Sequence, residues 1–251
     1  MRFGICTSID KLPVLEELGY DYLEANASAI EKMTEDEFET ALKTINSCNI
    51  GVESMAVLFP GEIFFYSTPM GTIEEHLNRT FSRASKLGIK VSVFGSGRCR
   101  KKPDDIEFSK AYSQLKKILI RTGEIAQEYG IQIAIEPLNH GETNMINSVN
   151  EAAIMAYEAG LANVGPLADS YHMFVEKENM ESIRTAGALT HVHTALLKGR
   201  AYPVHETESL GSFFEALNDI DYSGRVSIEG STDNFKEDAV NSLVVLKSLS
   251  K

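Results

Sequence analysis

The sequence is poor in several residue types, and each shortage excludes a class of protein. Its 251 residues include no tryptophan and three cysteines, and Cys6, Cys48 and Cys99 show no C-x-x-C spacing. This pattern argues against both a disulfide framework and a zinc ribbon. No apolar run reaches the roughly 20 residues that cross a bilayer. The first residues also lack the apolar stretch and cleavage site of a signal peptide. We therefore expect a cytoplasmic protein with no membrane partner.

Positive charge is scarce as well. The chain has 24 lysines and arginines against 36 aspartates and glutamates, and its formal net charge is −12. Nucleic-acid binding usually needs a basic face, so no nucleic-acid partner is expected. No shift in composition and no Ser/Gly-rich linker divides the chain, so residues 1–251 are expected to form a single domain. The sequence leaves open whether the chain forms a homo-oligomer.

Short apolar segments alternate with amphipathic ones along the whole chain. The expected strands are residues 2–7, 20–24, 50–56, 89–94, 131–135, 164–168, 189–192 and 226–228. The expected helices are residues 11–18, 34–48, 73–87, 106–129, 148–159, 178–185 and 210–217, and a last one from 235. Such alternation implies a parallel sheet.

Eight strand–helix units in about 250 residues fit a closed (β/α)8 TIM barrel. The competing fold is a doubly wound open sheet. That fold favours a glycine-rich phosphate turn after the first strand, and the sequence has Thr7-Ser8-Ile9-Asp10 there. The α/β barrel is therefore the predicted fold class.

Four of the expected strands run directly into a side chain that can ligate a metal. These are Glu136, Asp169, His193 and Glu229. In a TIM barrel they fall at the C-terminal ends of the strands, where the chemistry lies. Three converging carboxylates repel one another unless a cation lies between them. Oxygen ligands with one imidazole suit Mn²⁺, Mg²⁺ or Co²⁺, and Zn²⁺ stays open. We expect one divalent metal ion per chain.

Other side chains lie near these strand ends in the sequence. His191 lies two residues before His193, so it points to the same side one layer deeper, and we interpret it as support or core rather than as a ligand. His172 and Glu142, on loops, can hydrogen-bond a substrate hydroxyl, and Arg200 can hold a substrate oxygen. Arg98, in a Gly-Ser-Gly-Arg loop after the fourth strand, is the cation of this loop that we expect to point inward, where it can meet an anion such as a phosphate or a sugar acid.

Four segments resemble the metal-site motifs of the xylose-isomerase-like TIM barrels, and most of all the ketose 3-epimerase group that acts on D-tagatose and D-psicose. They are Ile135-Glu136-Pro137-Leu138-Asn139, Asp169-Ser170-Tyr171-His172-Met173, His191-Val192-His193-Thr194 and Ser227-Ile228-Glu229. The resemblance covers most of the chain and is strongest from the fifth strand onward.

The resemblance implies a role for each matching residue. It makes Glu136, Asp169, His193 and Glu229 the metal ligands. It makes Glu136 and Glu229 also the pair that exchanges protons on opposite faces of the sugar. Glu142 and His172 match substrate-binding positions, and Arg200 matches the family's arginine if its loop carries one extra residue. The family's Pro-Gly-x-Gly element and tryptophan are replaced here by Tyr202-Pro203-Val204-His205-Glu206.

These residues imply a specific chemistry. A metal that binds a carbonyl and a neighbouring hydroxyl acidifies the C–H between them and stabilises an enediolate. One glutamate takes the proton and the other returns one, which gives an epimer if the return is to the opposite face of the same carbon. We expect a metal-dependent epimerase or isomerase acting on a small sugar or sugar phosphate, in the first place a ketose 3-epimerase.

Several alternatives stay open. An aldose–ketose or hydroxypyruvate-type isomerase and a dehydratase use the same scaffold and the same proton abstraction. The DNA-repair endonuclease branch needs more histidines and a basic face, neither of which this acidic chain has. A non-catalytic sugar-binding module has no need for two opposed carboxylates.

Overall fold

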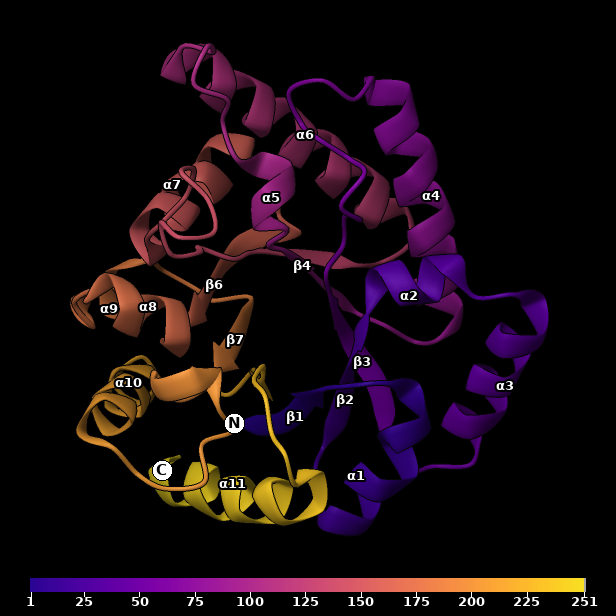
Figure 1. The fold of residues 1–251 in the computed structure, drawn as a ribbon, viewed down its shortest axis with the longest axis vertical. Coiled ribbons are helices and arrows are strands. Elements are labelled where there is room, and N and C mark those ends of the chain that lie inside the picture. Colours follow the sequence, from indigo (N-terminus) through magenta and orange to yellow (C-terminus); the bar gives the residue numbers. More distant parts are fainter. Residues whose placement is uncertain (251) are drawn as a thin grey trace.

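Eight parallel strands form a closed barrel at the centre of the molecule (Figure 1). The computed structural model describes residues 1–250. Each strand pairs with the next, and β8 closes the ring on β1, with Gly4 opposite Ser227. The strands are β1 Arg2–Cys6, β2 Tyr22–Asn26, β3 Gly51–Ala56, β4 Val91–Phe94, β5 Gln132–Ile135, β6 Val164–Asp169, β7 His191–Thr194 and β8 Arg225–Ile228. The predicted (β/α)8 barrel is confirmed, and the open sheet is excluded.

Helices surround this barrel on the outside (Figure 1). They are α1 Leu12–Leu18, α2 Ala27–Lys32, α3 Glu35–Asn46, α4 Met70–Lys86, α5 Gly97–Arg100, α6 Phe108–Glu128, α7 Val149–Ala159, α8 Ser170–Glu176, α9 Glu181–Thr185, α10 Glu208–Asp219 and α11 Phe235–Leu249. The short helices α2, α5 and α8 were not predicted, and each follows the end of a strand. Among the described residues, no helix combines the length and the apolar character needed to span a membrane.

Two strands are shifted by two residues at both ends relative to the sequence prediction. β2 covers Tyr22–Asn26 rather than 20–24, and β7 covers His191–Thr194 rather than 189–192. His193 therefore lies inside its strand instead of following it, which corrects its predicted position. The parallel register explains the shift, because His193 lies opposite Asp169 on β6.

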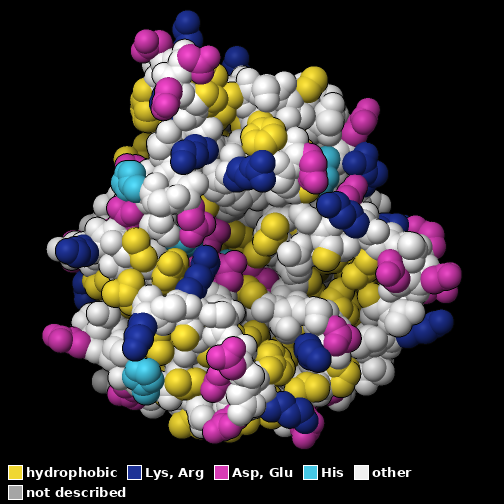
Figure 2. Space-filling model, in the orientation of Figure 1, with side chains coloured by type: hydrophobic (Ala, Val, Ile, Leu, Met, Phe, Trp, Pro, Cys, Tyr) yellow, Lys and Arg dark blue, Asp and Glu magenta, His cyan; other side chains and the backbone are white. Residues whose placement is uncertain are grey.

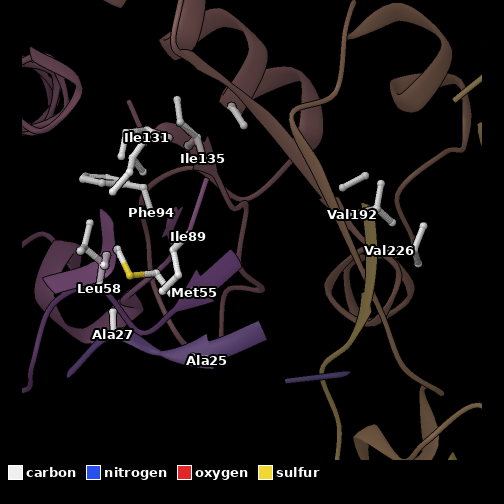
Figure 3. Close-up of a cluster of buried hydrophobic side chains, with 14 of the residues drawn as sticks. Ala25, Ala27, Met55, Leu58, Ile89, Phe94, Ile131, Ile135, Val192 and Val226 are labelled. Atoms are coloured by element: carbon white, nitrogen blue, oxygen red, sulfur yellow. The ribbon is translucent and has the colours of Figure 1, made fainter. Parts of the chain in front are cut away.

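The main hydrophobic core lies between the barrel and the surrounding helices. Alternate strand residues point outward into it, as Phe3 and Ile5 do on β1. Figure 3 shows side chains of this layer from several elements, among them Met55, Ile135 and Val192. Packing in this layer holds the helices against the barrel. The other face of each strand lines the barrel interior.

The barrel interior is partly apolar and partly polar. A small cluster of Ala56, Val91, Val93, Ala134 and Leu167 fills one part of it. The polar part includes Tyr22, whose hydroxyl lies 2.8 Å from that of Ser227. The Tyr22 ring crosses Gly4 so closely that a Cβ there would lie 2.4 Å from the ring, so β1 needs glycine at this position.

A charged cluster lies where the strands begin, at the end of the barrel opposite to the strand tips. Glu53 of β3 accepts two hydrogen bonds from Arg2, at 2.5 and 2.6 Å, and one from Arg225 at 2.7 Å. The cluster links β1, β3 and β8. A functional site is expected at the other end of the barrel, where the C-terminal ends of the strands lie.

Candidate metal and active site

The four predicted ligands come together at the C-terminal end of the barrel. Glu136, Asp169, His193 and Glu229 each offer a ligand atom, and these atoms all lie within 4.8 Å of one another. Asp169 ends β6, while Glu136 and Glu229 directly follow β5 and β8. The first three are buried and Glu229 is partly exposed. Burial of carboxylates at this spacing requires compensating positive charge.

His193 lies at the centre of this group. Its Nδ1 atom lies 3.1 Å from Oε1 of Glu136 and 3.0 Å from Oε2 of Glu229. Its Nε2 atom lies 2.9 Å from Oε1 of Glu24. Burial by itself lowers the pKa of this imidazole, but Glu24 and Glu229 outweigh burial and raise the pKa well above its usual value.

Glu24 is the residue that sequence reasoning missed. It is fully buried in β2, and it accepts hydrogen bonds from His191 Nε2 at 2.6 Å, Ser54 at 2.8 Å and Ser227 at 2.5 Å. Burial opposes its ionisation, yet the two imidazoles lower its pKa well below the usual value. A usable signal existed, because a glutamate between apolar residues of an internal strand needs a buried partner.

His191 lies one layer below His193, as its spacing predicts. It contacts Glu24 and Ser227, and its Nδ1 atom has no hydrogen-bond partner. His191 lies outside the group of four ligand-type residues. Its contact with Glu24 links it to His193 of that group.

His172 presents an N–H group beside Asp169. Its Nδ1 atom accepts a hydrogen bond from the Asn139 backbone N–H at 3.1 Å, which places the proton of the neutral ring on Nε2. That Nε2 is buried, lies 3.6 Å from Oδ2 of Asp169 and makes no hydrogen bond. A buried, unpaired donor next to the carboxylates is available for a ligand oxygen.

The side chain of Arg200 lies against the carboxylates of the ligand group. Its Nη2 atom lies 2.5 Å from Oε2 of Glu229 and 3.4 Å from Oδ2 of Asp169. Burial alone would lower the pKa of Arg200, but the neighbouring carboxylates raise it. Its backbone has a φ of +47°, and its guanidinium lies 4.8 Å from the centroid of the Tyr171 ring. Arg200 thus supplies positive charge to the group.

A cavity of about 270 Å³ opens above this group, and we call it the catalytic chamber. Its charged lining residues are Arg98, Glu136, Glu142, Arg200 and Glu229. Figure 2, in the orientation of Figure 1, shows a hollow near the middle of this face with acidic and basic side chains at its margin. Glu142 is exposed at the wall, where its Oε1 accepts a hydrogen bond from Asn139 at 3.2 Å.

The two arginines of α5, which follows β4, point in different directions. Arg98 lines the chamber with an exposed side chain, and its guanidinium lies 5.4 Å from the centroid of the Phe64 ring. Arg100 is the one that turns inward. It is fully buried and donates to the carbonyls of Phe94 at 3.2 Å and Glu136 at 2.7 Å. Arg98, the predicted anion-binding residue, therefore lies at the rim of the chamber. Arg100 holds the backbone of Glu136 in place.

The two glutamates of the group have different proton affinities. Burial, reinforced by the charge of Glu229, raises the pKa of Glu136. Burial also acts on Glu229, but His193 and Arg200 outweigh it and lower the pKa of Glu229 to about 2. The surroundings therefore distinguish two residues of the same chemical type.

Comparison with known proteins agrees with the fold. A family model described as a xylose isomerase-like TIM barrel matches residues 12–249. A D-psicose 3-epimerase of Agrobacterium fabrum is 28% identical over 239 residues, which cover 85% of this chain and 75% of that protein. A ketose 3-epimerase of Arthrobacter globiformis is 30% identical over 158 residues, which cover 62% of this chain and 54% of that protein.

Solved structures show the same architecture. The crystal structure of a D-psicose 3-epimerase in the presence of D-fructose has a TM-score of 0.87 and 22% identity, and the match covers 99% of each chain. The structure of an IOLI protein with a bound zinc atom has a TM-score of 0.80 and 18% identity, covering 99% of this chain and 98% of that one. At these identities the likeness establishes the fold.

Proposed function

The chain belongs to the xylose isomerase-like TIM barrel family, and we propose that within it the protein is a divalent-metal-dependent ketose 3-epimerase. The observation that carries this proposal is the convergence of Glu136 and Glu229 with Asp169 and His193 on one point. The names of the relatives, which are epimerases and isomerases, support the same class.

The donor set fits a divalent cation. Three carboxylates and one imidazole nitrogen within 4.8 Å of one another form a ligand group with mostly oxygen donors. Mn²⁺, Mg²⁺ and Co²⁺ suit such a group. A neighbouring structure described with a bound zinc atom supports testing Zn²⁺ too. Glu136, Asp169, His193 and Glu229 would hold the ion.

The chemistry then divides between the ion and the protein. Bound in this group, a divalent cation supplies Lewis-acid stabilisation of the negative charge that develops on the substrate oxygens. Glu136 and Glu229 follow β5 and β8, which are separated by β6 and β7, so their carboxylates approach a substrate from different sides. One carboxylate removes the proton and the other returns a proton to the opposite face.

Other residues around the ligand group bind and orient the sugar. The unpaired Nε2–H of His172 is placed to donate to a substrate oxygen beside Asp169. Glu142, at the chamber wall, is placed to accept from a hydroxyl. Arg200 lies against Glu229 and Asp169, where it can donate to a substrate oxygen and balance the carboxylate charge. These contacts would position the reacting carbon between the two glutamates.

A metal titration combined with a sugar panel tests the proposal. Metal-free protein is supplied with Mn²⁺, Mg²⁺, Co²⁺ or Zn²⁺ in turn and offered ketoses, aldoses and their phosphates, with products followed by NMR. We expect inversion at carbon 3 of a ketose. A change of carbonyl position would instead identify an aldose–ketose isomerase, and loss of water a dehydratase. A metal-loaded protein that changes none of these sugars would contradict the proposal.

A histidine variant tests the metal site separately. His193→Ala should sharply reduce metal content while circular dichroism stays unchanged. His205→Ala is the matched control, because His205 is exposed and lies outside the ligand group. Equal metal content in both variants would remove His193 from the site.

A further inference from the structure

A second cavity lies beside the catalytic chamber, between the ends of β1, β2 and β3 and helix α2. We call it the β1–β3 pocket. Its volume is about 350 Å³, against about 270 Å³ for the chamber. The two cavities share Ala56, Val57 and Glu229 as lining residues. The site therefore has two adjoining parts, with a candidate catalytic glutamate at their junction.

The two parts differ in chemistry. Aliphatic side chains form much of the wall of the β1–β3 pocket, including Ile9, Ala29, Ile30 and Met33. Its charged lining residues are carboxylates, Glu24 and Glu229, and within the described part of the chain no lysine or arginine lines it. An anionic group would meet repulsion there, whereas an apolar group would leave water for an aliphatic surface. The chamber, by contrast, carries Arg98 and Arg200.

The backbone at the junction is held in an uncommon conformation. Val57 has a φ of +57°, which is rare for a β-branched residue. Its side chain is 43% exposed and lines both cavities. The Ser28 hydroxyl of α2 donates to the Val57 carbonyl at 2.8 Å. Such strained residues cluster at functional sites, and this one presents its apolar side chain between the two cavities.

We propose that the natural substrate is a keto sugar that carries an apolar substituent of about the size of an aromatic ring, and that the β1–β3 pocket binds this substituent. The assignment of the sugar portion to the catalytic chamber rests on the proposed function. Size supports the inference, since an apolar cavity of about 150 Å³ already accepts benzene, and the β1–β3 pocket measures about 350 Å³.

The test compares two ligands that differ only in the apolar group. The affinities of the 6-O-methyl and 6-O-benzyl ethers of one ketohexose, which keep the C2 carbonyl and the hydrogen on carbon 3, are measured by calorimetry on the metal-loaded protein. Because the benzyl group removes apolar surface from water, we expect the benzyl ether to bind about tenfold tighter than the methyl ether. Equal affinities would overturn the proposal.

Substitutions at Ala29 locate the binding to this pocket. Ala29→Phe fills the pocket and should abolish the preference for the benzyl ether. Ala29→Asp places a charge in the pocket, and it should fold because a carboxylate is favourable in the first turn of a helix, where Ala29 is the third residue of α2. Ala162→Leu, at an exposed alanine before β6, is the control that should keep the preference. A preference that survives both Ala29 variants would overturn the proposal.

These measurements separate the pocket from the reaction. Binding requires no turnover, so a benzyl preference lost in the Ala29 variants supports the pocket even if no sugar is epimerised. Epimerisation of free ketoses without any benzyl preference would leave the proposed function standing and refute the apolar substituent.

Discussion

The Nε2 atom of His193 lies 2.9 Å from Oε1 of Glu24, and this contact joins the candidate metal site to the polar interior of the barrel. Because a carboxylate accepts, the imidazole must carry its proton on Nε2, which turns Nδ1 toward Glu136 and Glu229. A carboxylate in this position fixes both the tautomer and the ring orientation of a metal-ligating histidine. We therefore expect Glu24 to act as a positioning residue.

Glu24→Gln should weaken metal binding without removing a ligand. Loss of such a supporting partner typically costs about 10–100-fold in metal affinity, and we expect a loss of that size. A chelator competition assay measures it on the metal-loaded protein. Glu53→Gln is the matched control, because Glu53 is a hydrogen-bonded carboxylate at the other end of the barrel. Equal affinity in the two variants would show that Glu24 does not orient His193.

Arg98 leads to a prediction about phosphorylated substrates. Its exposed side chain lines the catalytic chamber and lies outside the β1–β3 pocket, whose charged lining residues are both carboxylates. Arg98→Ala should therefore lower kcat/KM for a sugar phosphate by about tenfold or more, since a charge-assisted contact is lost, and should change the value for the free sugar little. Lys101→Ala, at an exposed lysine of the same loop, is the control. Equal losses on both sugars, or none, would contradict a phosphate-specific role.

Glu53 leads to a prediction about stability and pH. Burial opposes its ionisation, but hydrogen bonds from Arg2 and Arg225 lower its pKa below 4.5. A lowered folded-state pKa means that the ionised carboxylate stabilises the fold above about pH 4.5 and that this contribution fades as the pH falls through the folded-state value.

Glu53→Gln should accordingly lower the free energy of unfolding at pH 7 by about 1–2 kcal/mol, a modest figure because the arginines are partly exposed. Urea unfolding at pH 7 and pH 3 measures this, and the difference from the unsubstituted protein should shrink at pH 3. Glu39→Gln, at an exposed glutamate of α3, should show no such change. A destabilisation that is the same at both values would refute the charge-based explanation.

Much of the fold could be predicted from the sequence, because residues beside the end of a strand or the start of a helix indicate that boundary. Glu136 is followed by Pro137, which cannot donate a hydrogen bond to a strand ladder. The capping box at Thr34 correctly predicts the start of α3. The four ligand-type residues could be grouped because parallel strands deliver their C-terminal ends to one place. The comparisons support the expected family and the isomerase or epimerase class.

Features that depend on distant partners could not be predicted in the same way. His191 is separated from Glu24 by 167 residues, so the sequence does not reveal that Glu24 meets both histidines of β7 inside the barrel. The helix α8 was missed because Asp169, treated only as a ligand, also accepts a hydrogen bond from the Tyr171 N–H at 2.7 Å and begins that helix. Short helices of this kind have too few turns for an apolar period.

The central claim is that Glu136 and Glu229 exchange protons with one substrate carbon from opposite sides. It is tested most directly by epimerisation in deuterated water, with NMR detection of deuterium at the inverted carbon. Glu136→Gln and Glu229→Gln should each reduce turnover by at least about 10²–10⁴-fold, the usual contribution of a general base. Metal content is measured alongside, and the variant that lacks only the returning acid should still exchange deuterium into the substrate. Near-normal epimerisation by either glutamine variant would contradict the account and leave that glutamate as a metal ligand alone.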